Sequence, residues 1–254
     1  MNKVVFIMNL NQKNYCKGLS LVEIIISFTI LIFIFLLIYN SLISIQSFSE
    51  KQNKENIFKL ESNIIFQNLN KDLKEAVALF DNKTINIDSF KYNYLKNPDK
   101  IIFTTLNETG NSLLIIKFSN KEFFNNREVN TYKLICYYPE INNQNLYLKR
   151  IESNQNFYNI QDFSKEELEE NSNKLLFEIP LNIYKPKLPE NINKLNFYSK
   201  TLSKNLVPIN FKYNNNYYIY GGFEIFSSYK NFYISIYMFD KNIFSKFNYS
   251  LDIR

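Results

Sequence analysis

A single carboxylate, Glu23, stands inside an otherwise uncharged apolar segment that runs from residue 19 to residue 45. A charge in such a segment is costly unless it is paired or reaches the membrane interface. Two kinds of chemistry are therefore open to Glu23. It can form an ion pair with an amine, or its side chain can extend to the lipid headgroups and remain solvated.

Other residue types that carry out chemistry are scarce. The chain contains no histidine, which excludes His-based acid–base catalysis, triads that use His and the common His metal sites. Four glycines in 254 residues leave little room for a phosphate-binding loop or a nucleophile elbow, and neither motif occurs. Asp81, Asn82 and Asp99 favour turns over calcium ligation. We expect no catalytic residue, no cofactor and no metal, and we expect Cys136 to be a buried core residue.

The composition predicts a folded protein whose charge is placed unevenly. Aromatic residues make up 17% of the chain, which is incompatible with a disordered composition. Lys3, Lys13 and Lys17 supply three of the six net positive charges, and no acid lies within the first 18 residues. The remainder shows no run of Lys or Arg of the kind that nucleic-acid-binding proteins carry. This asymmetry predicts a cytoplasmic N-terminus and a main domain on the other side of the membrane.

The apolar segment, residues 19–45, is predicted to be a transmembrane helix. Twenty-seven helical residues span about 40 Å, more than the roughly 30 Å of a bilayer's hydrocarbon core. The segment is apolar on all sides, whereas the core helix of a soluble domain has a polar stripe. It is also longer than the apolar region of a cleaved secretory signal. We therefore expect it to stay with the mature protein as a single-pass anchor.

The sequence around this carboxylate, Lys17-Gly18-Leu19-Ser20-Leu21-Val22-Glu23, resembles the prepilin cleavage signal of type IV pilins and type II secretion pseudopilins. In that family a basic leader ends in glycine, and a membrane peptidase cuts after it on the cytoplasmic side. The new N-terminal residue is methylated, and a glutamate stands fifth in the mature chain. Here Gly18 matches the last leader residue, Leu19 the methylated first residue and Glu23 the fifth. The first mature residue of the family is most often Phe, so Leu19 is a departure.

The resemblance implies a bacterial structural subunit that is inserted in the inner membrane with its head periplasmic, or extracellular once in a filament. Its partners would be the prepilin peptidase, for which it is a substrate, and other pilin or pseudopilin subunits. In a filament of parallel helices, the amine of Leu19 in one subunit meets Glu23 of its neighbour, and this pair favours assembly in register. Residues 1–18 would be the leader, although translation starting at Met8 remains an alternative.

Residues 46–80 are predicted to continue the anchor as an amphipathic helix, because no Gly or Pro occurs between residues 19 and 97. Apolar residues recur there at spacings of three and four, namely Ile57, Leu60, Ile64, Ile65, Leu69, Leu73, Ala76, Val77 and Phe80. We expect this stripe to pack in cis on a sheet. A coiled-coil partner is the alternative.

Residues 81–254, which we call the head, are predicted to be rich in antiparallel strands. Short β-branched and aromatic runs alternate there with Asn, Asp, Gly and Pro, at 100–105, 113–118, 131–138, 146–151, 175–179, 194–198, 208–213, 217–220 and 232–239. Residues 165–171 suit a short surface helix. The predicted fold class is α+β and pilin-like, with a long N-terminal helix on a β-rich head.

Two further patterns bear a fainter resemblance to the larger minor subunits, the J-type pseudopilins and W-type minor pilins. One is the helix segment of residues 69–76, with Asp72-Leu73 at its centre. The other is the Tyr-rich strand of residues 132–138, followed by residues 146–150, which end in Arg150. A generic amphipathic helix and a generic hairpin explain the same residues equally well. The chain length favours a minor subunit.

Two other functions remain open from the sequence. The chain could be a single-pass anchored binding or adhesion protein with no filament role, or, less favoured, a membrane-tethered enzyme. The Tyr and Phe residues of the head would also suit contact with DNA or a secreted protein, but core packing accounts for most of them. The sequence does not distinguish pilus, secretion and DNA-uptake systems.

Overall fold

The computed structural model describes residues 20–142, 145–170, 175–177, 188, 195–228 and 231–252. The predicted cleavage residues Gly18 and Leu19 lie outside this part of the chain. The chain divides into two compact units, one ending at Lys51 and one beginning at Gln52.

Helix α1 runs from Leu21 to Lys74 over 54 residues, as expected for a stretch without Gly or Pro. In the first unit its apolar side chains are all exposed, and by length and composition the helix is suited to cross a membrane. Lys71 and Lys74 lie in its last turn, where positive charge interacts favourably with the helix dipole.

The helix ends six residues before the predicted end at Phe80, and that prediction was wrong. Residues Ala76–Phe80 form strand β1, which pairs antiparallel with β3. A short apolar run has the spacing of a helix face and also suits a fully buried strand, so periodicity alone does not separate the two.

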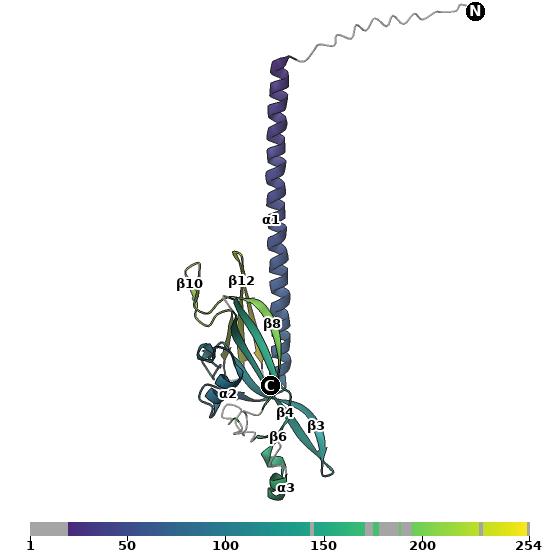
Figure 1. Ribbon diagram of the computed structural model, residues 1–254, viewed down its shortest axis with the longest axis vertical. Helices are drawn as coiled ribbons and strands as arrows, with labels where there is room; N and C mark the ends of the chain where they lie inside the picture. Colours follow the sequence, from purple (N-terminus) through teal and green to yellow (C-terminus); the bar gives the residue numbers. More distant parts are fainter. Residues whose placement is uncertain are drawn as a thin grey trace, which may run out of the picture. The chain divides into compact units, whose positions relative to one another are not determined.

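The second unit combines the last part of α1 with a large sheet (Figure 1). In the part of the head that the structure describes there are two further α-helices and two short 3-10 helices: α2 (Ile87–Tyr94), α3 (Lys165–Glu170), η1 (Pro98–Lys100) and η2 (Ile160–Asp162). The remaining strands are β2 (Thr109–Gly110), β3 (Leu113–Phe124), β4 (Arg127–Asn142), β5 (Asn145–Ser153), β6 (Phe157–Asn159), β7 (Leu175–Phe177), β8 (Phe197–Leu206), β9 (Phe211–Tyr213), β10 (Asn216–Tyr218), β11 (Phe223–Ser227), β12 (Asn231–Asp240) and β13 (Ile243–Asp252). The α+β class is confirmed.

Within the described residues, eleven strands form one sheet whose main path is β1-β3-β4-β5-β8-β12-β11-β2, and β13 pairs with β12. Pairing between named strands is antiparallel except between β6 and β7. Strands β9 and β10 form a separate hairpin. The predicted strand at 100–105 is wrong, because a 3-10 helix and one isolated bridge at Phe103 occupy that stretch.

Three hairpin turns explain part of the asparagine content of this glycine-poor chain. Both central residues have positive φ in the turns Asn125-Asn126, Asn214-Asn215 and Lys241-Asn242. Two-residue turns of this kind match the twist of the strands and require left-handed residues, for which Asn is the best choice after Gly. Asn-rich sequence therefore marks turns here.

The central strands are buried on both faces. In β3, Leu113 and Ile115 join a core that includes α1 residues, while Leu114 and Ile116 join a second core that includes Phe90 of α2. Successive strand residues point to opposite faces, so α1 and α2 cover opposite faces of the sheet. Cys136 belongs to the second core and is fully buried, as predicted.

The predicted apolar stripe of α1 divides in two. Ile65, Leu69 and Leu73 pack on the sheet, which confirms packing in cis. Ile57, Leu60 and Ile64, however, remain exposed. The sheet contacts a narrower face of the helix than the stripe covers, and Phe58, which the stripe does not include, is buried on that face instead.

Candidate functional site

Glu23 lies in the first turn of α1, where it forms a reciprocal pair of hydrogen bonds with Ser20. The backbone N–H of Ser20 donates to Glu23 Oε2 at 2.8 Å, and the backbone N–H of Glu23 donates to Ser20 Oγ at 3.2 Å. The carbonyl of Ser20 also accepts the first helical hydrogen bond, from Ile24. This is a capping box, which satisfies two of the donors that a helix start leaves unpaired.

The capping box is a role for Glu23 that the sequence reasoning missed. The signal was available, since a Ser followed three residues later by Glu, just before an apolar run, is a helix-start pattern. It accounts for a glutamate at this position without a partner amine. Glu23 therefore has two candidate roles. As a helix cap it needs only an oxygen that accepts a hydrogen bond. As the partner of a neighbouring amine it must carry its negative charge.

A second polar cluster lies where α1 meets the sheet, and we call it the docking network. At its centre Asp72, with a side chain 3% exposed, accepts four contacts. Arg150 donates from Nε to Oδ2 at 2.7 Å and from an η nitrogen to Oδ1 at 3.2 Å. Lys117 Nζ donates to Oδ1 at 2.9 Å, and the Tyr137 hydroxyl donates to Oδ2 at 2.6 Å. Both oxygens of this buried carboxylate thus accept two hydrogen bonds each.

Strand register explains why these side chains converge. Lys117, Tyr137 and Arg150 come from the consecutive strands β3, β4 and β5. Tyr137 and Arg150 are direct cross-strand partners. Side chains of such a pair share a face of the sheet, and this is the face on which α1 packs. Asp72 is close to the end of α1, so the network fixes the last turns of the helix over three strands.

Outer members of the docking network balance its charge. Glu75 accepts from Lys117 at 3.0 Å. Glu152 accepts from Arg150 at 2.7 Å and from Lys133 at 3.1 Å. The network thus contains three acids and three bases, with no excess charge left in a poorly solvated place.

The pKa values of the network follow from burial and pairing. Burial alone would raise the pKa of Asp72, but hydrogen bonds from Arg150, Tyr137 and Lys117 outweigh it and hold this pKa below its ordinary value. Burial and the adjacent Asp72 raise the pKa of Tyr137 well above its ordinary range. At neutral pH Asp72 is therefore ionised and Tyr137 is a neutral donor to it.

Acid is expected to weaken this attachment of α1. Since the folded-state pKa of Asp72 lies below its ordinary value of 3.8, its ionisation stabilises the fold fully above that value. The contribution is lost as the pH falls through the folded-state pKa. Thermal unfolding of the full chain in detergent, measured from pH 7 to pH 2, should show Asp72→Asn less stable than wild type at pH 7 and the difference shrinking in acid. A difference that stays constant with pH would contradict this assignment.

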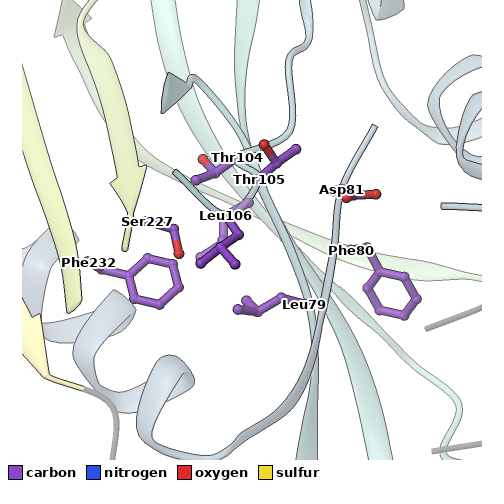
Figure 2. A pocket seen from close by; sticks show the side chains of 9 residues that line it. Leu79, Phe80, Asp81, Thr104, Thr105, Leu106, Ser227 and Phe232 are labelled. Carbon is purple, nitrogen blue, oxygen red and sulfur yellow. The ribbon is translucent and has the colours of Figure 1, made fainter. Parts of the chain in front are cut away.

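A small cavity near the β2 end of the sheet offers little for chemistry. Its volume is about 30 Å³, and Figure 2 shows Ser227 and Phe232 on one side of it and Phe80 and Asp81 on the other. The Ser227 hydroxyl is buried without a hydrogen-bond partner among the described residues. Such a volume suits an ordered water molecule, whereas ligand pockets occupy roughly 300–1,000 Å³.

The predicted and observed sites thus overlap in part. Glu23 is placed at the helix start, and the faintly patterned residues Asp72 and Arg150 are brought into direct contact. Within the described part of the chain, no group of three His, Cys, Asp or Glu side chains is arranged to hold a metal ion. Comparisons with protein-family models, with curated proteins and with solved structures found no match.

Proposed function

We propose that this chain is a minor pilin or pseudopilin, a structural subunit of a type IV pilus-like or type II secretion filament. The observation that carries the proposal is the spacing of Gly18, Leu19 and Glu23, followed by an uninterrupted apolar run. On this proposal the prepilin peptidase cuts after Gly18, Leu19 is methylated, and the subunit assembles through its N-terminal helix. Its partners are the peptidase, other subunits and the inner membrane.

The docking network supports the proposal from the other end of α1. A filament subunit must transmit force between its helix and its head, so the attachment of α1 to the sheet needs strength and a fixed geometry. A buried charge cluster enforces one arrangement, since misaligned partners would leave charges buried and unpaired. The residues with the faint minor-subunit pattern, Asp72 and Arg150, are members of this cluster.

Replacing Gly18 with leucine is expected to block processing. The precursor should then accumulate at about 2 kDa above the mature protein, the share of 18 residues in a 30.4 kDa chain. In cells that express the peptidase, gel mobility measures the size of the accumulated protein, and mass spectrometry identifies its N-terminal residue. Asn14→Leu, within the predicted leader, serves as a matched control that should leave cleavage intact. Unchanged processing of the Gly18 variant would overturn the proposal.

A plain single-pass anchored binding protein is the second candidate, because the capping box gives Glu23 a role that needs no partner amine. Ser20 and Glu23 complete a helix start whether or not the chain is cut. The same mass spectrometry separates the two functions in wild-type protein. A methylated Leu19 supports the filament subunit, and an intact or differently trimmed start supports the anchored binding protein.

A further inference from the structure

Aromatic side chains gather at one end of the second unit, around the β9–β10 hairpin and the turn between β12 and β13. We call this region the aromatic tip. Phe211 and Tyr213 of β9 contact Phe239 of β12 with ring centroids 5.0 and 6.0 Å apart. Tyr213 also stacks on Phe244 of β13 at 4.8 Å. These contacts attach the β9–β10 hairpin to strands β12 and β13 of the sheet.

The outer side of this hairpin is apolar and basic. Tyr217 is 65% exposed and Ile219 is 60% exposed, whereas Tyr218 is buried and Phe211 and Tyr213 are partly buried. Lys212 lies over the Tyr217 ring at 5.3 Å, and it is the only charged residue between 207 and 220. Exposed tyrosine and isoleucine beside lysine form the combination that settles at a membrane interface, where rings lie among headgroups and ammonium groups meet phosphates.

The aromatic tip lies at the end of the second unit where the chain enters it. Asp240, at the end of β12, forms an ion pair with Lys54 of α1, two residues after the unit begins at Gln52. In sequence, Lys54 follows the apolar segment by only nine residues, a helical length of about 14 Å. Figure 1 shows the β9–β10 hairpin and the β12–β13 turn at the same end of the sheet.

We propose that the aromatic tip binds the surface of the membrane in which the chain is anchored, with Tyr217 and Ile219 at the headgroup level and Lys212 and Lys241 facing anionic lipid phosphates. Lys54 lies only nine positions after the apolar segment, so chain connectivity puts the bilayer surface within reach of the tip, and the charge of Lys212 and Lys241 favours anionic lipids over a protein partner. Asp240 does not oppose this, because Lys54 neutralises it. The inference rests on the membrane-anchoring part of the proposed function and is independent of filament assembly.

The absence of tryptophan from the chain permits a direct test. Full-length Tyr217→Trp is placed, one chain per nanodisc, in bilayers of phosphatidylglycerol and phosphatidylcholine that carry a nitroxide at the headgroup. Ile219→Trp provides a second reporter, and Phe123→Trp, at a position 79% exposed in the β3–β4 hairpin, is the matched control. We expect the nitroxide to quench the tryptophan fluorescence at positions 217 and 219 at least about twofold more than at position 123. This quenching should fall with Lys212→Glu or at high salt.

Equal quenching at 217, 219 and 123 in chains that co-purify with nanodiscs would overturn the inference and leave the proposed function standing. Quenching that is unaffected by Lys212→Glu, by salt and by removal of phosphatidylglycerol would overturn the role of anionic phosphate. A chain that fails to enter nanodiscs would overturn the inference together with the anchor. Normal cleavage after Gly18, measured separately, would still test the filament function.

Discussion

Replacing Arg150 with methionine is expected to lower the free energy of unfolding by about 3–5 kcal/mol. Methionine keeps most of the side-chain volume but removes both donors to Asp72. Asp72 would then be left buried with only Lys117 and Tyr137 as partners. Urea unfolding of the full chain in detergent, followed by far-UV circular dichroism, measures the change.

The control for this experiment is Lys121→Met. Lys121 pairs with Glu128 at 2.8 Å, but both side chains are more than half exposed. Ion pairs of that kind contribute little to the free energy of unfolding, because water solvates the separated charges. Comparable losses for the two variants would show that the docking network is no more important than a surface pair. A midpoint shift without a change in slope would confirm that compactness is retained.

Removing every charge at the centre of the docking network tests whether the network adds to the stability of the fold or only fixes the arrangement of α1 on the sheet. Asp72→Leu combined with Lys117→Met and Arg150→Met leaves no buried charge unpaired. Such replacements are often neutral or stabilising. We expect the triple variant to recover most of the stability that Arg150→Met loses, which would indicate that the network is kept for the arrangement of α1 on the sheet.

The sequence predicted those elements whose pattern is long and local. An apolar run without Gly or Pro predicts α1, and alternating β-branched and aromatic residues predict β3, β4 and β12. Strand β13 was missed, because its alternation of Phe247 and Tyr249 with Asn and Ser is hard to tell from the biased composition of the whole chain. Strand β1 was assigned to the helix for a similar reason, since five consecutive apolar or small residues suit either structure.

The docking network shows what a single sequence leaves out. Asp72 and Arg150 each belong to a pattern visible in the sequence, but 78 positions separate them. Their contact depends on the β4–β5 register and on which face of α1 meets the sheet, and neither follows from local spacing. No sequence pattern marks Lys117, because a lysine in a strand is ordinarily solvent-exposed. The capping box, by contrast, is local and was readable from Ser20 and Glu23 alone.

The charge of Glu23 is expected to matter more than its capping hydrogen bonds. A capping box accepts Gln in place of Glu, because the amide oxygen still accepts from the backbone N–H. Glu23→Gln therefore keeps the helix start and removes the charge that a neighbour's amine would pair with. On the proposed function, Glu23→Gln and Glu23→Ala should be cleaved normally after Gly18, and both should be incorporated into filaments about tenfold less than wild type, the loss expected when about 1.4 kcal/mol of pairing is removed.

Ser20→Ala supplies the complementary variant, since it removes the side-chain acceptor for the Glu23 N–H and leaves the carboxylate in place. It should weaken the helix start by about 1 kcal/mol and leave incorporation close to wild type. Shearing filaments from cells and comparing filament-bound with membrane-bound subunit measures all three variants. If Ser20→Ala and Glu23→Ala reduce incorporation while Glu23→Gln does not, the carboxylate acts as a helix cap. The uncharged amide would then suffice at position 23, and an amine partner for Glu23 would be excluded.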